Sequence, residues 1–290
     1  MRRFSFSGMI LLLAGGISLA VSPAAGAKIR AVILTGQHSY PKEFWDNFDS
    51  MADLQYIHVD LPDHSEIFED ISAWNYDVII MHNSGQRISG KREQNFLTLL
   101  QRGVGLVVIH HAVCAYEDWP EFRKIEGTKF YGAAEVYEGK RYESNYIEPT
   151  SIKVVIDDKA NPLMQGFADF TITDEVYTDM SYEKDNHVLA HTTHASVPGA
   201  PLVWTRRYAN SNVFVITLGH RAATLNGPFM SAVVPRAIRW AVSEPSAVVL
   251  PARPKGGHGE SSRPISGYFL TAPGEDAHRD ARGRLSPPVP

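Results

Sequence analysis

The sequence predicts an α/β fold in which a mostly parallel sheet lies between helices. Three observations support this prediction. Short runs of almost continuous apolar residues recur along the chain, as expected of strands buried on both faces. Segments with apolar residues at helical spacing separate several of these runs, which favours βαβ connections. The clearest run, Val104 to Ile109, ends in the paired histidines His110 and His111. In an open α/β sheet, ligands bind at the edge where such strands end.

Nine segments are predicted to be strands, because each is continuously apolar or alternates apolar and polar residues. In chain order they are residues 29–34, 54–59, 76–81, 104–109, 151–156, 170–177, 188–191, 202–204 and 212–218. Helical spacing predicts helices at Lys42 to Met51, Ser89 to Arg102 and Phe229 to Val242. Pro235 either starts the regular part of the last helix or kinks it. The stretch from Ala112 to Trp119 also has helical character.

The composition divides the chain into three parts. Residues 1–27 have the pattern of a secretory signal: two arginines, an apolar run from Met9 to Ala20, and small residues ending at Ala27. We therefore expect cleavage after Ala27 and a periplasmic or secreted protein. A membrane anchor is the alternative, but the run is short for the roughly 20 residues of a membrane span. Residues 28–245 form the predicted folded domain, without a membrane span, and the Pro- and Gly-rich residues 246–290 are predicted to be a disordered tail.

Charge and cysteine content limit the partners and the chemistry. The first 27 residues carry two of the 28 basic residues and none of the 32 acidic ones, which leaves 26 minus 32, or −6. This balance gives no reason to expect nucleic acid or an anionic membrane as a partner. Cys114 is the single cysteine, so no internal disulfide can form, and we expect a buried side chain rather than a nucleophile. The sequence does not indicate an oligomeric state.

Histidines follow four of the predicted strands within four residues. They are His38, His82, the pair His110 and His111, and His220. If these strands are parallel neighbours, the histidines reach one edge of the sheet. Neighbouring residues of an extended chain point to opposite faces of the sheet. We therefore expect only one of the pair to face the site and the other to pack against the rest of the protein. A single histidine is more often structural, but four equivalent positions indicate a shared site.

Carboxylates and a phenol follow another strand. Asp174, Glu175 and Tyr177 lie at the end of residues 170–177. Beside histidine they could act as a general base, an orienting partner or oxygen ligands of a divalent cation; a solvated acidic turn is the alternative. The chain has no HExxH, CxxC, Walker or GxSxG motif. An aromatic stretch at 130–146 suits either a loop over a pocket or a surface excursion.

These blocks together resemble the ThuA-like (trehalose utilization) family. The resemblance rests on Gly103 to Pro120, Asp174 to Tyr177, Leu218 to His220 and Ile238 to Trp240, and it extends from about Lys28 to Val242. It implies a three-layer, flavodoxin-like sheet between helix layers, similar to class I glutamine amidotransferases. It also implies a role in carbohydrate metabolism, on disaccharides or keto-sugars made from them.

Two departures qualify what the resemblance implies. The amidotransferases carry a nucleophilic cysteine directly after the central strand, where this chain has His110 and His111, and Cys114 lies about one helical turn further on. Glutaminase activity is therefore not expected. A His-Pro turn common in the family is Asn161-Pro162 here, and a histidine often found shortly before it is replaced near Tyr146 to Glu148. A metal site that used this histidine would be altered or lost.

Two functions follow as hypotheses. The first is an exported hydrolase, lyase or isomerase of a disaccharide or keto-sugar glycoside. In this hypothesis His110 or His111 is the base, Asp174 or Glu175 orients it, and His220 stabilises the developing oxygen charge. The predicted substrate contacts are His38, His82, Asn83, Trp119 and Tyr177. A divalent metal held by some of these groups is a variant, although no cofactor is certain. The second hypothesis is a saccharide-binding module without turnover.

Overall fold

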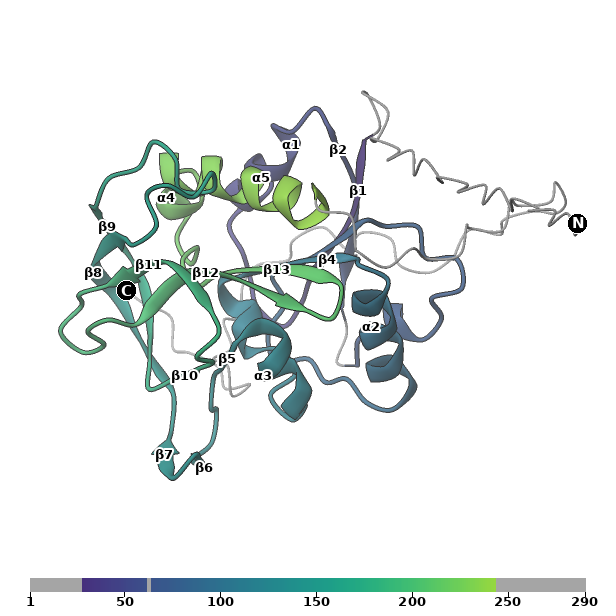
Figure 1. Cartoon of the computed structure of the whole chain (residues 1–290), viewed down its shortest axis with the longest axis horizontal. Helices are drawn as coiled ribbons and strands as arrows, with labels where there is room; N and C mark the ends of the chain where they lie inside the picture. The colour runs from purple at the N-terminus through teal and green to yellow at the C-terminus, as the bar shows by residue number, and fades with distance from the viewer. Residues whose placement is uncertain (1–27, 62–63, 244–290) are drawn as a thin grey trace, which may run out of the picture.

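A nine-stranded sheet runs through the computed structural model, which describes residues 28–61 and 64–243 (Figure 1). The predicted signal peptide and the predicted tail lie outside these residues. The strand order is β2-β1-β3-β4-β13-β12-β11-β8-β9. The strands are β1 (Ile29–Thr35), β2 (Leu54–Asp60), β3 (Val78–Met81), β4 (Gly105–Ile109), β8 (Asn145–Ile156), β9 (Phe170–Thr178), β11 (His187–Thr192), β12 (Pro201–Tyr208) and β13 (Ser211–Ile216). Each of the nine predicted strands overlaps one of them.

The sheet has a parallel half and an antiparallel half. Strands β2, β1, β3, β4 and β13 are parallel to their neighbours in this group. Strands β12, β11, β8 and β9 add to the β13 edge in antiparallel orientation. Only two residues separate Tyr208 at the end of β12 from Ser211 at the start of β13, and so short a turn can join only antiparallel strands. The predicted parallel sheet is thus extended by an antiparallel part.

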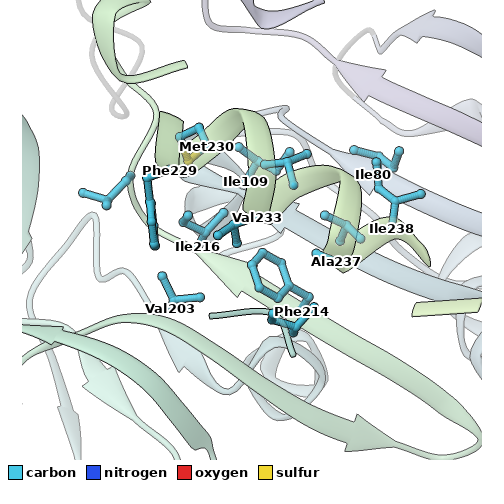
Figure 2. Packing of buried hydrophobic residues seen from close by; sticks show 14 of the residues in the cluster. Ile80, Ile109, Val203, Phe214, Ile216, Phe229, Met230, Val233, Ala237 and Ile238 are labelled. Atoms are coloured by element: carbon cyan, nitrogen blue, oxygen red, sulfur yellow. The ribbon is translucent and has the colours of Figure 1, made fainter. Parts of the chain in front are cut away.

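Helices cover both faces of the sheet (Figure 1). Alternate residues of β1 enter two separate buried clusters: Ala31 and Ile33 pack on the side of α5, Val32 and Leu34 on the side of α2. Figure 2 shows the first cluster, in which α5 lies across the middle of the sheet. The helices are α1 (Asp46–Asp49), α2 (Lys91–Gln101), α3 (Pro120–Glu126), α4 (Ala222–Leu225) and α5 (Pro228–Ser243).

The glycine that interrupts the apolar run of β4 has a packing reason. A Cβ at Gly105 would lie 2.7 Å from the carbonyl oxygen of Ala241 in α5. Because real Cβ atoms do not approach so closely, only glycine lets this helix pack directly on the central strand. Pro235 lies inside α5 and is buried, so the helix continues through it.

The other predicted helices differ in detail. Residues Lys42 to Met51 form a 3₁₀ turn, Lys42–Phe44, followed by the short α1. The stretch after the paired histidines begins as a 3₁₀ helix, His110–Cys114, and α3 starts only at Pro120, where proline is favoured in the first helical turn. Further 3₁₀ and strand elements are Glu66–Phe68, β5 (Thr128–Lys129), β6 (Glu135–Tyr137), β7 (Lys140–Tyr142) and β10 (Ser181–Tyr182).

The middle of the aromatic stretch at 130–146 forms a surface hairpin, whereas Phe130 and Tyr131 at its start are buried. Strands β6 and β7 pair with each other and project from the body of the molecule (Figure 1). Val136 at this hairpin is 69% exposed. Only the end of the stretch, Tyr146, belongs to the large sheet. Within the described residues, the helices are too short or too polar to cross a membrane.

A candidate active site of histidines and carboxylates

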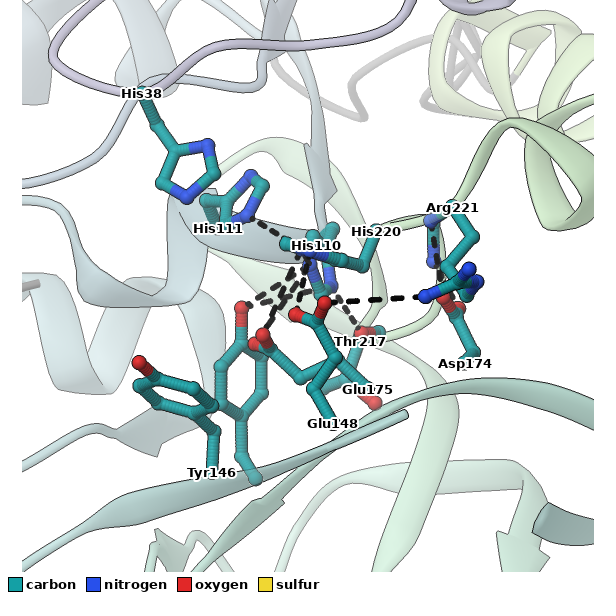
Figure 3. A network of polar contacts seen from close by, with 12 residues as sticks. His38, His110, His111, Tyr146, Glu148, Asp174, Glu175, Thr217, His220 and Arg221 are labelled. Carbon is teal, nitrogen blue, oxygen red and sulfur yellow. Dashed lines mark hydrogen bonds and ion pairs between the residues drawn. The ribbon is translucent and has the colours of Figure 1, made fainter. Parts of the chain in front are cut away.

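Five imidazoles meet where the parallel strands end. His38 follows β1, His110 and His111 follow β4, and His220 follows β13 (Figure 3). The fifth imidazole, that of His82, follows β3. The ring centroids of His38 and His111 are 3.5 Å apart, those of His82 and His111 5.1 Å, and those of His110 and His220 5.3 Å. The predicted convergence of these side chains on one edge of the sheet is therefore confirmed.

Both members of the histidine pair face this cluster, which corrects the prediction that one of them packs elsewhere. The prediction assumed an extended chain, but His110 has a φ of 49° and opens a 3₁₀ helix. The chain turns there, so alternation between faces does not apply. The Nε2 atoms of His110 and His111 both lie 3.2 Å from Nδ1 of His220. A positive φ at a residue other than glycine is strained and is typical of functional sites.

Hydrogen bonds outside the cluster set the tautomers of two rings. Nδ1–H of His110 donates to the Thr217 carbonyl at 2.6 Å, which leaves a lone pair on Nε2. Nε2–H of His220 donates to Glu148 at 2.5 Å, which leaves a lone pair on Nδ1. The two lone pairs face each other across 3.2 Å. A proton or a cation between them is needed to make this contact favourable.

Two carboxylates flank His220 and have opposite pKa shifts. Glu175 is 5% exposed, and its oxygens lie 3.8 Å from Nε2 of His110 and 3.5 Å from Nδ1 of His220. The pKa of Glu175 is raised to about 8, chiefly by burial and also by the neighbouring Glu148 carboxylate, against the opposing effect of His220. The hydrogen bond from His220 lowers the pKa of Glu148. At neutral pH, Glu175 thus carries a proton and Glu148 is ionised.

The pKa values of the histidines are also shifted in opposite directions. Burial lowers the pKa of His110 and His111 well below the usual value, and that of His82 to about 3. Burial opposes the charged form of His220 as well, but the hydrogen bond to Glu148 and the nearby Glu175 outweigh it and raise the pKa. The site therefore combines neutral buried imidazoles with one that favours the imidazolium form.

Asp174 positions His220 instead of contacting its ring. Its carboxylate accepts hydrogen bonds from the backbone N–H of Gly219 at 2.8 Å and of Arg221 at 3.0 Å, on either side of His220. Gly219 has a φ of 124°, a conformation that side chains other than glycine rarely adopt. Asp174 thus fixes the tight turn that carries the imidazole. Of the two alternatives for the orienting carboxylate, Asp174 and Glu175, it is Glu175 that lies beside the imidazoles.

The structure places some of the predicted substrate contacts at the site and others away from it. Tyr177 is at the site: its ring stacks on His110 with centroids 5.3 Å apart. Asn83 is buried and donates to Gln86 at 2.7 Å, so its amide serves the loop after β3. Trp119 is 7% exposed and packs against Phe96, Tyr116 and Phe122. Trp119 is therefore a core residue, which corrects its assignment as a residue that stacks on a sugar.

An open pocket of about 560 Å³ gives access to the cluster. His38 and Tyr40 line one part of it, and Glu148, His220 and Arg221 line another. Glu148 was absent from the predicted site residues, although the replacement near Tyr146 to Glu148 marked this place. It reaches the cluster because β8 pairs with β9, where Tyr146 is opposite Tyr177. Such long-range pairing has no local signal in the sequence.

The donor set fits a divalent cation. His110, Glu175 and His220 form one group whose ligand atoms lie within 4.8 Å of one another, and His38, His111 and His220 form a second. Nδ1 of His111 and both ring nitrogens of His82 are buried without a hydrogen-bond partner among the described residues. Imidazole and carboxylate ligands with outer carboxylate and carbonyl partners are typical of zinc sites. The residues present are therefore compatible with such an ion.

Comparisons with known proteins agree with this architecture. A ThuA-like protein from Parabacteroides merdae aligns with a TM-score of 0.63 and 20% identity, over 78% of this chain and 94% of that one. A ThuA-like protein from Bacteroides uniformis aligns with a TM-score of 0.54 and 20% identity, over 77% of this chain and 96% of that one. At this identity the likeness shows the fold. Among curated proteins there is no match.

The sequence also matches a family model directly. The match is to ThuA, described as trehalose utilisation, and covers residues 30–241, which includes every residue of the histidine and carboxylate cluster. This description suggests a carbohydrate-related role. With its sheet, its cluster and this match taken together, the chain belongs to the ThuA, or trehalose utilisation, family.

Proposed function

We propose that this protein is an exported enzyme of carbohydrate catabolism that acts on a disaccharide or keto-sugar glycoside. The observation that carries the proposal is the pair Glu148 and Glu175, whose pKa values are shifted apart beside neutral imidazoles: Glu148 lines the open pocket, and Glu175 is buried behind it. Pairs of titratable groups shifted in this way are typical of acid and base partners in catalysis. The signal-like composition of residues 1–27 supports export. The helices on both faces support the three-layer, flavodoxin-like arrangement implied by the family.

The chain's own residues provide the proton transfers. Burial keeps the pKa of His111 low and its imidazole neutral, so this side chain is the candidate base that accepts a proton from a carbon next to a sugar ketone. Glu175, protonated below pH 8, gives its proton to the glycosidic oxygen as the C–O bond breaks. The His220 imidazolium stabilises the charge on the enolate oxygen. Together, these proton transfers and the cleavage of the C–O bond amount to an elimination. Lyase activity is therefore favoured over hydrolysis or isomerisation.

A divalent cation is compatible with this site. In place of the protons on Glu175 and His220, the ion would be held by His110, Glu175 and His220, with His38 and His111 as the alternative ligands around the shared His220. When bound, the ion supplies Lewis acidity that polarises a sugar oxygen. Cys114 has no part in the proposed chemistry, because it is buried and burial raises the pKa of its thiol. This agrees with the expectation that the protein is not a glutaminase.

The test is turnover by the full-length chain. Disaccharides and their keto derivatives are incubated with the protein, with EDTA or with added Zn²⁺, and products are identified by NMR. We expect cleavage of a keto-disaccharide, loss of this activity in His111→Ala, and retention in His187→Ala. His187 is the matched control, because it is an exposed histidine that pairs with Asp158 and does not line the pocket.

A saccharide-binding module is the second candidate function. The position directly after β4, where the related fold of the amidotransferases has its nucleophilic cysteine, holds His110 and His111 here, and this favours it. Binding of the sugars without any product, with or without Zn²⁺, would overturn the enzyme proposal and support this module.

A further inference from the structure

We infer that Tyr146 is the surface on which a pyranose ring of the substrate stacks, next to the acid–base cluster. The inference rests on the proposed function and names the class of ligand that the pocket takes: a ring sugar instead of an open-chain polyol. Tyr146 thereby takes the role that the sequence assigned to Trp119.

The first argument is the position of Tyr146 on strand β8. Tyr146 pairs directly with Tyr177 of β9, so both side chains lie on the same face of the sheet. Glu148 is two residues further along β8, where a bulge interrupts the regular pairing with β9. Figure 3 shows Tyr146 rising from the strand on the same side as Glu148 and Glu175, toward the imidazoles.

The second argument is exposure. Tyr146 is 38% exposed, whereas Tyr177 opposite it is 4% exposed and packs on His110. Among the described residues, the other large hydrophobic side chains with comparable exposure are Ile57 and Val136. Ile57 lies on the opposite edge strand and Val136 on the surface hairpin, so Tyr146 is the member of this group next to the cluster. An aromatic ring exposed beside a polar pocket is typical of ligand recognition.

The third argument is the chemistry of the neighbours. A pyranose has an apolar C–H face and a rim of hydroxyl groups. Tyr146 offers a flat aromatic face, while Glu148 and Arg221, whose charged groups are 3.9 Å apart, line the pocket with an acceptor and several donors. These groups can bind hydroxyls at the rim of a ring that rests on Tyr146. The stacked ring would then present its bonds to Glu175 and His220.

The experiment uses trehalose and sorbitol as probes with the full-length chain. Saturation-transfer NMR and calorimetric titration compare the wild type with Tyr146→Ala, Tyr146→Phe and Ile57→Ala. Ile57→Ala is the matched control, because it removes an exposed apolar side chain from the far edge of the same sheet. We expect trehalose to bind more tightly than sorbitol, with the strongest saturation at its axial C–H protons. Tyr146→Ala should weaken trehalose binding about tenfold, and Tyr146→Phe and Ile57→Ala should change it less than twofold.

The outcomes separate this inference from the proposed function. If trehalose binds and Tyr146→Ala binds it as tightly as the wild type, the stacking role is overturned while the proposed function stands. Equal binding of sorbitol and trehalose by the wild type also overturns the ring preference. If the wild type neither binds nor converts any sugar, the proposed function fails, and this inference fails with it.

Discussion

The two halves of the sheet contribute different chemistry to one site. The parallel half supplies imidazoles from the ends of β1, β3, β4 and β13, and the antiparallel half supplies Glu148, Glu175 and Tyr177 from β8 and β9. Histidines of the antiparallel half behave differently: His187 and His191 pair with surface aspartates. The comparison indicates that strand ends gather the bases, while the added antiparallel strands bring the acids, which raise the pKa of His220.

The largest expected effect is the loss of the proton donor from the antiparallel half. Glu175→Gln keeps the shape of the side chain but cannot ionise or give up a proton. We expect keto-disaccharide turnover to fall by about 10²–10⁴-fold, the usual contribution of general acid catalysis. Glu143→Gln, an exposed glutamate paired with Arg141, is the control and should retain full activity. Unchanged turnover in Glu175→Gln would contradict the proposal that the antiparallel half supplies the proton donor.

The next effect is the loss of the carboxylate that sets the His220 tautomer. Glu148→Gln removes the partner that raises the pKa of His220 and also helps to raise that of Glu175. We expect activity to fall about 10–100-fold, as for outer partners of ligating histidines. The pH profile gives a sharper readout: the alkaline limb, near pH 8 in the wild type, should move to lower pH. A uniform loss without this movement would indicate only a structural role.

Stability tests the hydrogen bonds that join the two halves. Asp174→Ala leaves the N–H groups of Gly219 and Arg221 without their carboxylate partner in a buried turn. We expect the free energy of unfolding to fall by about 2–4 kcal/mol, because two charge-assisted bonds of about 1.5–3 kcal/mol each are lost, while the burial that raises the pKa of Asp174 offsets part of their contribution. Asp157→Ala, which removes a half-exposed surface pair with His191, should cost less than about 1 kcal/mol. Equal losses in chemical denaturation would contradict this account of Asp174.

A pH effect on stability follows from Glu175. Its pKa in the folded state is about 8, above the ordinary value of 4.5. Between pH 4.5 and pH 8, the folded state therefore holds a proton that the unfolded state has lost. The contribution of Glu175 to stability is therefore fully present below pH 4.5 and is lost as the pH rises to about 8. Denaturant titrations should show that Glu175→Gln flattens this decline. An unchanged slope in the variant would contradict the raised pKa.

The smallest effect is expected at Tyr177. Its hydroxyl is 3.5 Å from both ring nitrogens of His110, at the limit of a hydrogen bond, while its ring stacks on the imidazole. Tyr177→Phe keeps the stacking, so we expect less than a fivefold loss of turnover, consistent with a contribution of about 1 kcal/mol or less from the hydroxyl. A loss comparable to that of Glu175→Gln would make the phenol a proton donor in its own right.

The same division explains what the sequence could predict. The apolar strands and the histidines after them are local patterns, and parallel topology then brings His38, His82 and His220 together without further information. The antiparallel half depends on pairing between distant segments, which has no local signal. Glu148 and the exposed position of Tyr146 follow from the β8–β9 register, and they emerge only from the structure.

Two errors have local physical causes. The expectation that only one of His110 and His111 faces the site failed because His110 adopts a positive φ, which apolar patterning cannot reveal. Trp119 was assigned to the site from its place in the chain, but the 3₁₀ helix His110–Cys114 turns the chain back and buries Trp119 among aromatic residues. Asp174 and Glu175 are adjacent, and the strand directs one to the backbone of the His220 turn and the other to the imidazoles.

The central claim is that the two halves form one acid–base unit, and the most direct measurement is the titration of Glu175. Carbon-13 NMR of glutamate-labelled, EDTA-treated protein would follow each side-chain carboxyl, with Glu175→Gln used for assignment. The account predicts a Glu175 pKa near 8 that rises further in His220→Gln, because His220 lowers it in the wild type. A Glu175 carboxyl that titrates near its ordinary value, or whose pKa is the same in His220→Gln as in the wild type, would contradict the account.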